Sequence, residues 1–237
     1  MLSYPTAHPS LGGCVILSPE VVQAQMHRPP ARNSVNDAPP QTDVEEAVRW
    51  LRNDGVVVFP TETLYGLGAD IFSLPALRRI FGIKGRPPDL ALPVLVADWE
   101  QLETVVQPLD DRRLRLARRF WPGPLTLVLP RSSRVPDMVT GGGNTVAVRM
   151  PDHCLPLALA RELGRPITGT SANRSGQGDL MTLDAVESQL GHLVDYIIRT
   201  GPEPKGTAST VVDLSSGNPR LIREGAIPFR QVLEAGM

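Results

Sequence analysis

The run Val56-Val57-Val58-Phe59 is the feature that most constrains the fold. Four consecutive apolar residues, most of them β-branched, are typical of a strand that is buried on both faces. A segment of helical periodicity precedes the run, with apolar residues at Val44, Ala47, Val48 and Leu51. Thr42 or Asp43 is expected to cap that helix. Helices that cover a buried strand indicate a protein that mixes α and β structure.

Further helical and strand patterns follow without the strict strand–helix–strand order of a dinucleotide-binding fold. The patterns predict helices over 74–81, 110–120, 153–163, 183–190 and 229–233. They predict strands over 92–96, 125–129, 145–149, 196–199, 210–214 and 220–223. Pro93 indicates that the strand over 92–96 lies at a sheet edge or a bulge. We therefore expect an α/β fold with a sheet of mixed strand direction.

The first 41 residues differ from the rest, because they hold seven of the 24 prolines and have weak hydrophobic periodicity. This composition predicts an irregular N-terminal arm over 1–41 and a folded domain over 42–237. The arm lacks an Arg-rich amphipathic helix, so a bacterial N-terminus is favoured over a mitochondrial transit peptide. A formal net charge of −1 argues against a protein coated for nucleic-acid binding.

Several classes of function lose support because their motifs are missing. The sequence holds no Walker loop, no complete GxGxxG after a strand and no GxSxG elbow. Two cysteines and four scattered histidines give neither a disulfide framework nor a zinc-binding spacing. No apolar run reaches the roughly 18–20 residues that span a bilayer. We therefore expect a cytoplasmic protein without a metal site of its own.

The segment Lys84-Gly85-Arg86-Pro87 offers two cations close together. In an extended segment residues i and i+2 point to the same side, so Lys84 and Arg86 would converge on one phosphate or carboxylate. A solvated basic loop is the alternative interpretation of the tetrapeptide alone.

Two polar stretches follow apolar strands, where α/β proteins often place their sites. In the first, Thr61, Thr63 and Tyr65 alternate and would present three hydroxyls on one face. In the second, Ser171 and Asn173 lie among small residues whose backbone N–H groups could bind an anion. Capping threonines and a plain Asn/Gly turn are the respective alternatives.

In order and spacing, seven segments between Pro60 and Ile227 together resemble the YrdC/Sua5 family, the threonylcarbamoyl-AMP synthases. They are PTETLYGLGAD, KGRPPD, WPGPLTLVLP, TVAVRMPDH, TSANRSG, STVVDL and IREGAI. The resemblance covers roughly residues 42–232 and implies the short, single-domain form. It implies a YrdC-like twisted mixed sheet with flanking helices around a concave, positively charged cavity.

The same resemblance implies a nucleotidyltransferase. Its reaction would form L-threonylcarbamoyladenylate and pyrophosphate from L-threonine, bicarbonate or CO2, and ATP, with Mg2+ entering on the ATP. The product would serve the N6-threonylcarbamoyladenosine (t6A37) modification of tRNA, after transfer to a t6A transferase complex. An RNA-binding or regulatory homologue without adenylate synthesis is the alternative, and the arginine-rich segment over 110–120 is what favours RNA binding.

Carried over to matching positions, the resemblance implies a role for ten residues. Lys84 and Arg86 would be the catalytic residues and hold the ATP phosphates. L-Threonine would be bound by Thr63, Arg149, Gly169 and Ser209. ATP would also be contacted by Thr145, Ser171, Asn173 and Arg223. The sequence departs from the usual family pattern at Leu90, Leu95 and Asp179, which leaves open whether these side chains contact substrate, while backbone contacts could persist there.

Overall fold

The computed structural model describes residues 41–236. The arm expected over 1–41 therefore lies outside the described residues except for Gln41, which already belongs to a helix. The division between an arm and a domain at residue 42 stays a prediction.

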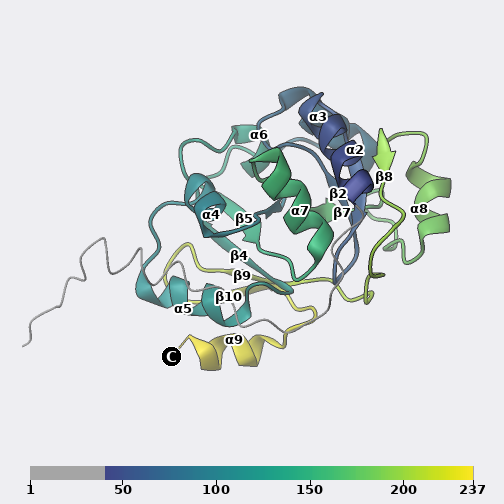
Figure 1. The fold of residues 1–237 in the computed structure, drawn as a ribbon. Helices are drawn as coiled ribbons and strands as arrows, with labels where there is room; N and C mark the ends of the chain where they lie inside the picture. The colour runs from purple at the N-terminus through teal and green to yellow at the C-terminus, as the bar shows by residue number, and fades with distance from the viewer. Residues whose placement is uncertain (1–40, 237) are drawn as a thin grey trace, which may run out of the picture. The chain divides into compact units, whose positions relative to one another are not determined.

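Two sheets of mixed strand direction form the framework (Figure 1). The four-stranded sheet has the order β7-β2-β1-β8, with bounds Thr170–Ser171, Tyr65–Gly68, Val57–Pro60 and Tyr196–Ile197. The six-stranded sheet has the order β10-β9-β4-β5-β3-β6, with bounds Arg220–Arg223, Thr210–Asp213, Leu125–Pro130, Thr145–Arg149, Val94–Leu95 and Ile167–Thr168. Parallel and antiparallel pairs occur in both sheets, which confirms the expected mixed α/β architecture.

Eight helices flank these strands in the described part of the chain. They are α2 (Gln41–Arg52), α3 (Leu74–Lys84), α4 (Trp99–Val105), α5 (Asp111–Phe120), α6 (Asp137–Thr140), α7 (Cys154–Leu163), α8 (Leu183–Leu190) and α9 (Phe229–Ala235). The sequence patterns missed α4 and α6, which are only seven and four residues long. Such short helices present less than two turns of periodicity.

Strand β1 is covered on both sides, as its apolar run predicts. Val57 and Phe59 belong to a core cluster that includes residues of α2 and α7, which lie side by side in Figure 1. Val56 and Val58 belong to the second cluster, which includes Leu77 and other residues of α3. Successive strand residues point to opposite faces, so each half of the run packs against different helices. Both faces of β1 are buried against apolar side chains, so polar functional residues can follow only at the end of the strand.

Three local predictions are wrong for identifiable reasons. Thr42 and Asp43 do not cap α2, because the helix already includes Gln41; the Asp43 carboxylate instead accepts hydrogen bonds from the hydroxyls of Tyr196 and Thr200. Pro93 does not mark an edge strand. Strand β3 begins only after Pro93 and pairs with a strand on each side.

The third wrong prediction concerns the segment that carries the two cations. It is not extended, because α3 continues to Lys84 and ends at Gly85. Gly85 has a φ of 59°, a left-handed conformation that glycine adopts at low cost at a helix end. Lys84 and Arg86 therefore flank a helix terminus.

The chain crosses from one sheet to the other at Gly169. Strand β6 of the six-stranded sheet ends at Thr168, and β7 of the four-stranded sheet begins at Thr170. The Gly169 N–H donates to the Pro93 carbonyl at 2.8 Å. This crossing places the polar segment that follows residue 169 beside the start of β2, the strand that pairs with β1.

Candidate functional site

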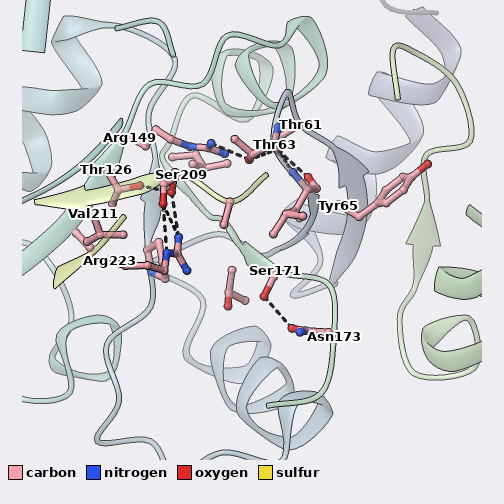
Figure 2. A pocket seen from close by; sticks show the side chains of 18 of the residues that line it. Thr61, Thr63, Tyr65, Thr126, Arg149, Ser171, Asn173, Ser209, Val211 and Arg223 are labelled. Carbon is pink, nitrogen blue, oxygen red and sulfur yellow. Dashed lines mark hydrogen bonds between the residues drawn. The ribbon is translucent and has the colours of Figure 1, made fainter. Parts of the chain in front are cut away.

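A cavity of about 360 Å³ lies between the ends of the two sheets. Nine of the ten residues that the resemblance singled out line it, namely Thr63, Lys84, Arg86, Arg149, Gly169, Ser171, Asn173, Ser209 and Arg223. Thr145 is not among the lining residues, although Ala147 of the same strand is. Figure 2 shows that the side chains reach the cavity from segments far apart in the sequence. The fold thus brings these positions together, while their individual roles stay predictions.

The residues after β1 form a tight turn that positions Thr63. The Thr61 N–H donates to the Leu64 carbonyl, and the Thr61 hydroxyl donates to the same oxygen at 2.7 Å. The Thr63 hydroxyl lies 2.8 Å from that of Thr61 and accepts from Arg149 Nη1 at 2.9 Å. The expectation of three hydroxyls on one face is wrong, because the turn breaks the alternation and the Tyr65 ring points away from both threonines (Figure 2).

Arg149 is a buried cation, only 5% exposed at the end of β5. Its Nη1 lies 3.4 Å from Glu62 Oε1, and the other carboxylate oxygen of Glu62 is buried without a hydrogen-bond partner. Burial lowers the pKa of the Arg149 guanidinium, while the nearby Glu62 raises it and Arg223 lowers it further. A guanidinium stays charged even so, which leaves a strong attraction for an anion in the cavity.

Lys84 is also buried, and its ammonium contacts the backbone of the segment after β7. Nζ donates to the carbonyl oxygens of Ser171 and Asn173 at 2.6 and 2.9 Å, and to Asn173 Oδ1 at 3.1 Å. Burial lowers the pKa of Lys84 to about 8; the charge of Arg86 lowers it too, and Asp179 opposes the shift. The Ser171 hydroxyl donates to Asn173 Oδ1 at 2.7 Å, as Figure 2 shows.

Arg86 is held at the cavity wall by the chain just beyond it. Its Nη2 donates to the carbonyls of Leu90 and Ala91 at 2.9 and 2.6 Å, and its guanidinium carbon lies 5.8 Å from the centre of the Phe81 ring. Burial lowers the pKa of Arg86. These contacts orient the fork and leave Nη1 without a hydrogen bond to any described residue, so that side of the guanidinium can bind an anion.

Arg223 reaches the cavity from β10. Its Nε and Nη2 donate to the Ser209 carbonyl at 3.2 and 2.9 Å, and Nη2 also lies 3.2 Å from the Ser209 hydroxyl. That hydroxyl shares a hydrogen bond of 2.9 Å with Thr126. Thr126 lines the cavity too, but the sequence did not single it out. A hydroxyl inside the otherwise apolar run of β4 was the signal that could have found it.

Comparison with known proteins agrees with this geometry. The family model Sua5_yciO_yrdC, described as telomere recombination, matches residues 49–225. The chain belongs to the Sua5/YciO/YrdC family.

Relatives of this family include proteins named threonylcarbamoyl-AMP synthase. That of Pyrococcus abyssi is 44% identical over 78% of this chain and 55% of its own, and that of Bacillus subtilis is 43% identical over 84% and 57%. A putative threonylcarbamoyl-AMP synthase of Mycobacterium leprae is 37% identical over 81% of this chain and 86% of its own. The chain thus spans just over half the length of the first two relatives and most of the third.

Solved structures of the family show the same fold. The crystal structure of P. abyssi Sua5 complexed with L-threonine superposes with a TM-score of 0.78 at 42% identity, over 81% of this chain and 56% of that one. The crystal structure of E. coli YciO gives a TM-score of 0.75 at 29% identity, over 81% and 93% of the two chains.

Of the three positions that depart from the usual pattern of the Sua5/YciO/YrdC family, only Leu95 is among the residues that line the cavity. Leu90 is 48% exposed and contributes its carbonyl oxygen to Arg86. The Asp179 carboxylate lies 3.4 Å from the Asn173 amide nitrogen. Two of the three therefore support residues of the site through polar contacts.

Two arginines of helix α5, the arginine-rich segment that suggested RNA binding, donate hydrogen bonds within the protein. The Arg113 guanidinium donates to the carbonyls of Leu214 and Ser215, and Arg112 donates to the Gly217 carbonyl. Residues 41–236 contain no group of acidic, histidine or cysteine side chains that could hold a metal ion. Nor do they contain a helix with the length and apolar character of a membrane span.

Proposed function

We propose that this protein is an L-threonylcarbamoyladenylate synthase, which makes threonylcarbamoyl-AMP and pyrophosphate from L-threonine, bicarbonate or CO2, and ATP. One observation carries the proposal: Lys84, Arg86, Arg149 and Arg223 converge on a single cavity from three separate segments, the end of α3, β5 and β10. Lys84 and Arg149 are buried and Arg86 is half-buried, and burying cations around one space is costly unless anions enter it. A triphosphate and an amino-acid carboxylate supply those anions, and relatives with this name belong to the same family.

The cavity divides into two chemically different regions. Arg149 and Thr63 form a charge-assisted pair next to Gly169, which suits the carboxylate and hydroxyl of L-threonine. Arg86 and Arg223 lie with Ser171, Asn173 and Ser209 and suit the nucleotide and its phosphates. Ser209 is shared between the two regions: its hydroxyl contacts Arg223 of the nucleotide region, and the resemblance assigns Ser209 to L-threonine. Thr145, on the same strand as Arg149, would extend the nucleotide region.

The reaction requires mainly positioning and charge stabilisation. The L-threonine amine forms a carbamate with loss of water from bicarbonate, or with loss of a proton when CO2 reacts, and the carbamate oxygen then attacks the α-phosphorus of ATP. A new O–P bond forms as the bond to pyrophosphate breaks, and negative charge builds on the phosphate oxygens. Guanidinium groups held by hydrogen bonds at the cavity would stabilise that charge, so no covalent nucleophile is needed.

Mg2+ would enter this site on the ATP. No carboxylate lies among the described residues that line the cavity, and oxygen ligands are what Mg2+ requires. The ion would therefore be bound by the phosphates and help to neutralise them.

The product would be passed to a t6A transferase complex for the modification of tRNA, which places the protein in the cytoplasm. Direct tRNA contact is not required for adenylate synthesis. The internal hydrogen bonds of Arg112 and Arg113 weigh against α5 as an RNA-binding face.

Release of pyrophosphate from ATP tests the proposal directly. We expect release that requires both L-threonine and bicarbonate, with L-valine or L-serine in place of L-threonine as matched controls. ATP binding without release under any condition would instead indicate a regulatory homologue. A protein that binds RNA but neither binds nor turns over ATP would overturn the proposal.

A further inference from the structure

Lys84 uses its entire donor capacity inside the protein. An ammonium has three N–H groups, and Nζ has three acceptors within 3.1 Å, on Ser171 and Asn173. The side chain is buried, with the residue only 3% exposed. The Lys84 carbonyl also accepts from the Ser175 N–H at 2.9 Å. Lys84 therefore binds the segment after β7 through both its side chain and its backbone.

That segment, residues 171–176, is the wall of the cavity opposite Arg149 and is called here the 171–176 loop. Asn173 stabilises it further, because its amide nitrogen donates to the Gln177 carbonyl at 2.9 Å. Four residues of the loop line the cavity: Ser171, Asn173, Ser175 and Gly176. Many of the hydrogen bonds of the loop therefore involve the Lys84 ammonium or the Asn173 side chain beside it.

Arg86 differs from Lys84 in this respect. Only Nη2 of its guanidinium donates to described residues, namely to the carbonyls of Leu90 and Ala91. Nη1 has no such bond. Moving Lys84 onto a phosphate would break three hydrogen bonds and leave the Asn173 carbonyl without a donor among the described residues, whereas Arg86 can bind a phosphate without losing a contact.

We infer that Lys84 is a positioning residue, which fixes the 171–176 loop instead of binding a phosphate of ATP, and that Arg86 supplies the phosphate contact. The inference rests on the proposed function for the identity of the anion, but the loop's dependence on Lys84 does not. The charged groups that act on the ammonium are Arg86, which lowers its pKa, and Asp179, which raises it.

Hydrogen–deuterium exchange of the ligand-free protein tests the inference. Lys84→Met keeps an apolar stem and removes the charge, so we expect faster exchange in the peptide that covers 170–180, on the order of tenfold or more. Arg86→Met should leave that peptide unchanged. Lys205→Met is the matched control, because Lys84 and Lys205 are the chain's two lysines and Lys205 is exposed.

Kinetics supply a readout that a purely structural residue would not move. Lys84→Met should lower kcat/KM on the order of 100-fold, because displacement of the 171–176 loop would misplace the residues that position the substrates. In the wild type kcat/KM should fall as the pH rises through about 8, where Lys84 loses a proton and one donor. That limb of the pH profile should vanish in Lys84→Met.

Two results would overturn the inference. One is unchanged exchange over 170–180 in Lys84→Met together with a loss of ATP binding, which a direct phosphate ligand would give. The other result applies if Lys84→Met does not fold. In that case, exchange over 170–180 in the wild type, corrected for its intrinsic pH dependence, would overturn the inference if it did not accelerate between pH 7 and 9.5. Absence of pyrophosphate release in the wild type would refute the proposed function and leave the exchange result standing.

Discussion

Glu62 and Arg149 form an ion pair inside the protein, with Oε1 and Nη1 separated by 3.4 Å and both side chains less than 10% exposed. Arg149 also donates to Thr63, the neighbour of Glu62 in the sequence. The pair therefore holds the turn after β1 against the end of β5. Glu62 neutralises the buried Arg149 cation. The hydrogen bond that Arg149 donates to Thr63 lies at the cavity, which Thr63 lines.

Removing the charge of Glu62 should destabilise the protein. Glu62→Gln keeps the shape and leaves Arg149 buried without its counter-charge, which typically costs about 3 kcal/mol of unfolding free energy. Urea denaturation measures this loss. Glu103→Gln, on the exposed side of α4, is the control and should stay within about 0.5 kcal/mol of the wild type. Equal stability of Glu62→Gln and the control would show that the pair contributes nothing.

Gly169 and Leu95 should be energetically coupled. A Cβ at Gly169 would lie 2.4 to 2.8 Å from three side-chain atoms of Leu95, which is itself 1% exposed. Gly169→Ala should therefore cost about 1–3 kcal/mol by overpacking. In the double variant with Leu95→Ala the two losses should be less than additive, by about 0.5–3 kcal/mol in a cycle of four unfolding curves. Strict additivity would contradict the contact.

His153 should make stability depend on pH. Its Nδ1 accepts from the Leu155 N–H at the start of α7, and its Nε2 lies 3.1 Å from the Pro202 carbonyl, so the neutral ring with its proton on Nε2 fits both contacts. Burial lowers the pKa of His153, an effect that Arg149 adds to and that Pro202, Glu62 and Asp152 oppose. The unfolded chain then binds this proton more readily than the folded one.

The stabilisation from a neutral His153 is fully present above the unfolded pKa of about 6.5 and is lost as the pH falls from there through the lower folded value. His153→Asn keeps a capping side chain and removes the titration. Its unfolding free energy should fall less than that of the wild type between pH 7.5 and pH 5. His192→Asn, at an exposed position, should behave as the wild type. The same pH dependence in all three proteins would exclude His153 as the source.

Arg86 should be needed for turnover more than for folding. Arg86→Lys keeps a charge but loses the fork that reaches Leu90, Ala91 and the cavity together. We expect pyrophosphate release to fall on the order of 100-fold or more, with a native circular dichroism spectrum. Arg78→Lys, at an exposed position of α3, the helix that ends just before Arg86, is the matched control for charge. Loss of structure in Arg86→Lys but not in Arg78→Lys would give Arg86 a structural role.

Elements with strong periodicity could be predicted from the sequence, and marginal ones could not. The apolar run through β1 predicted burial on both faces, since four successive apolar residues leave no polar side. The apolar stripe of α2 predicted which face of that helix is buried. The end of α3 was misplaced, because Ile83 and Lys84 are buried by tertiary contacts that no local pattern records. The same limit applies to β3, whose two residues are stabilised by strands from elsewhere in the chain.

The sequence by itself determined the chemical inventory: hydroxyls after β1, two cations around Gly85, and a small-residue loop after Gly169. Only the tertiary structure decided how they are used. It directed the Lys84 ammonium to the 171–176 loop, paired Arg149 with Glu62 and turned the Tyr65 ring away from Thr61 and Thr63. The physical reason is that the partners of these side chains lie far away in the sequence, 89 residues for Lys84 and Asn173 and 87 for Arg149 and Glu62, so hydrogen bonding and burial are set by the fold.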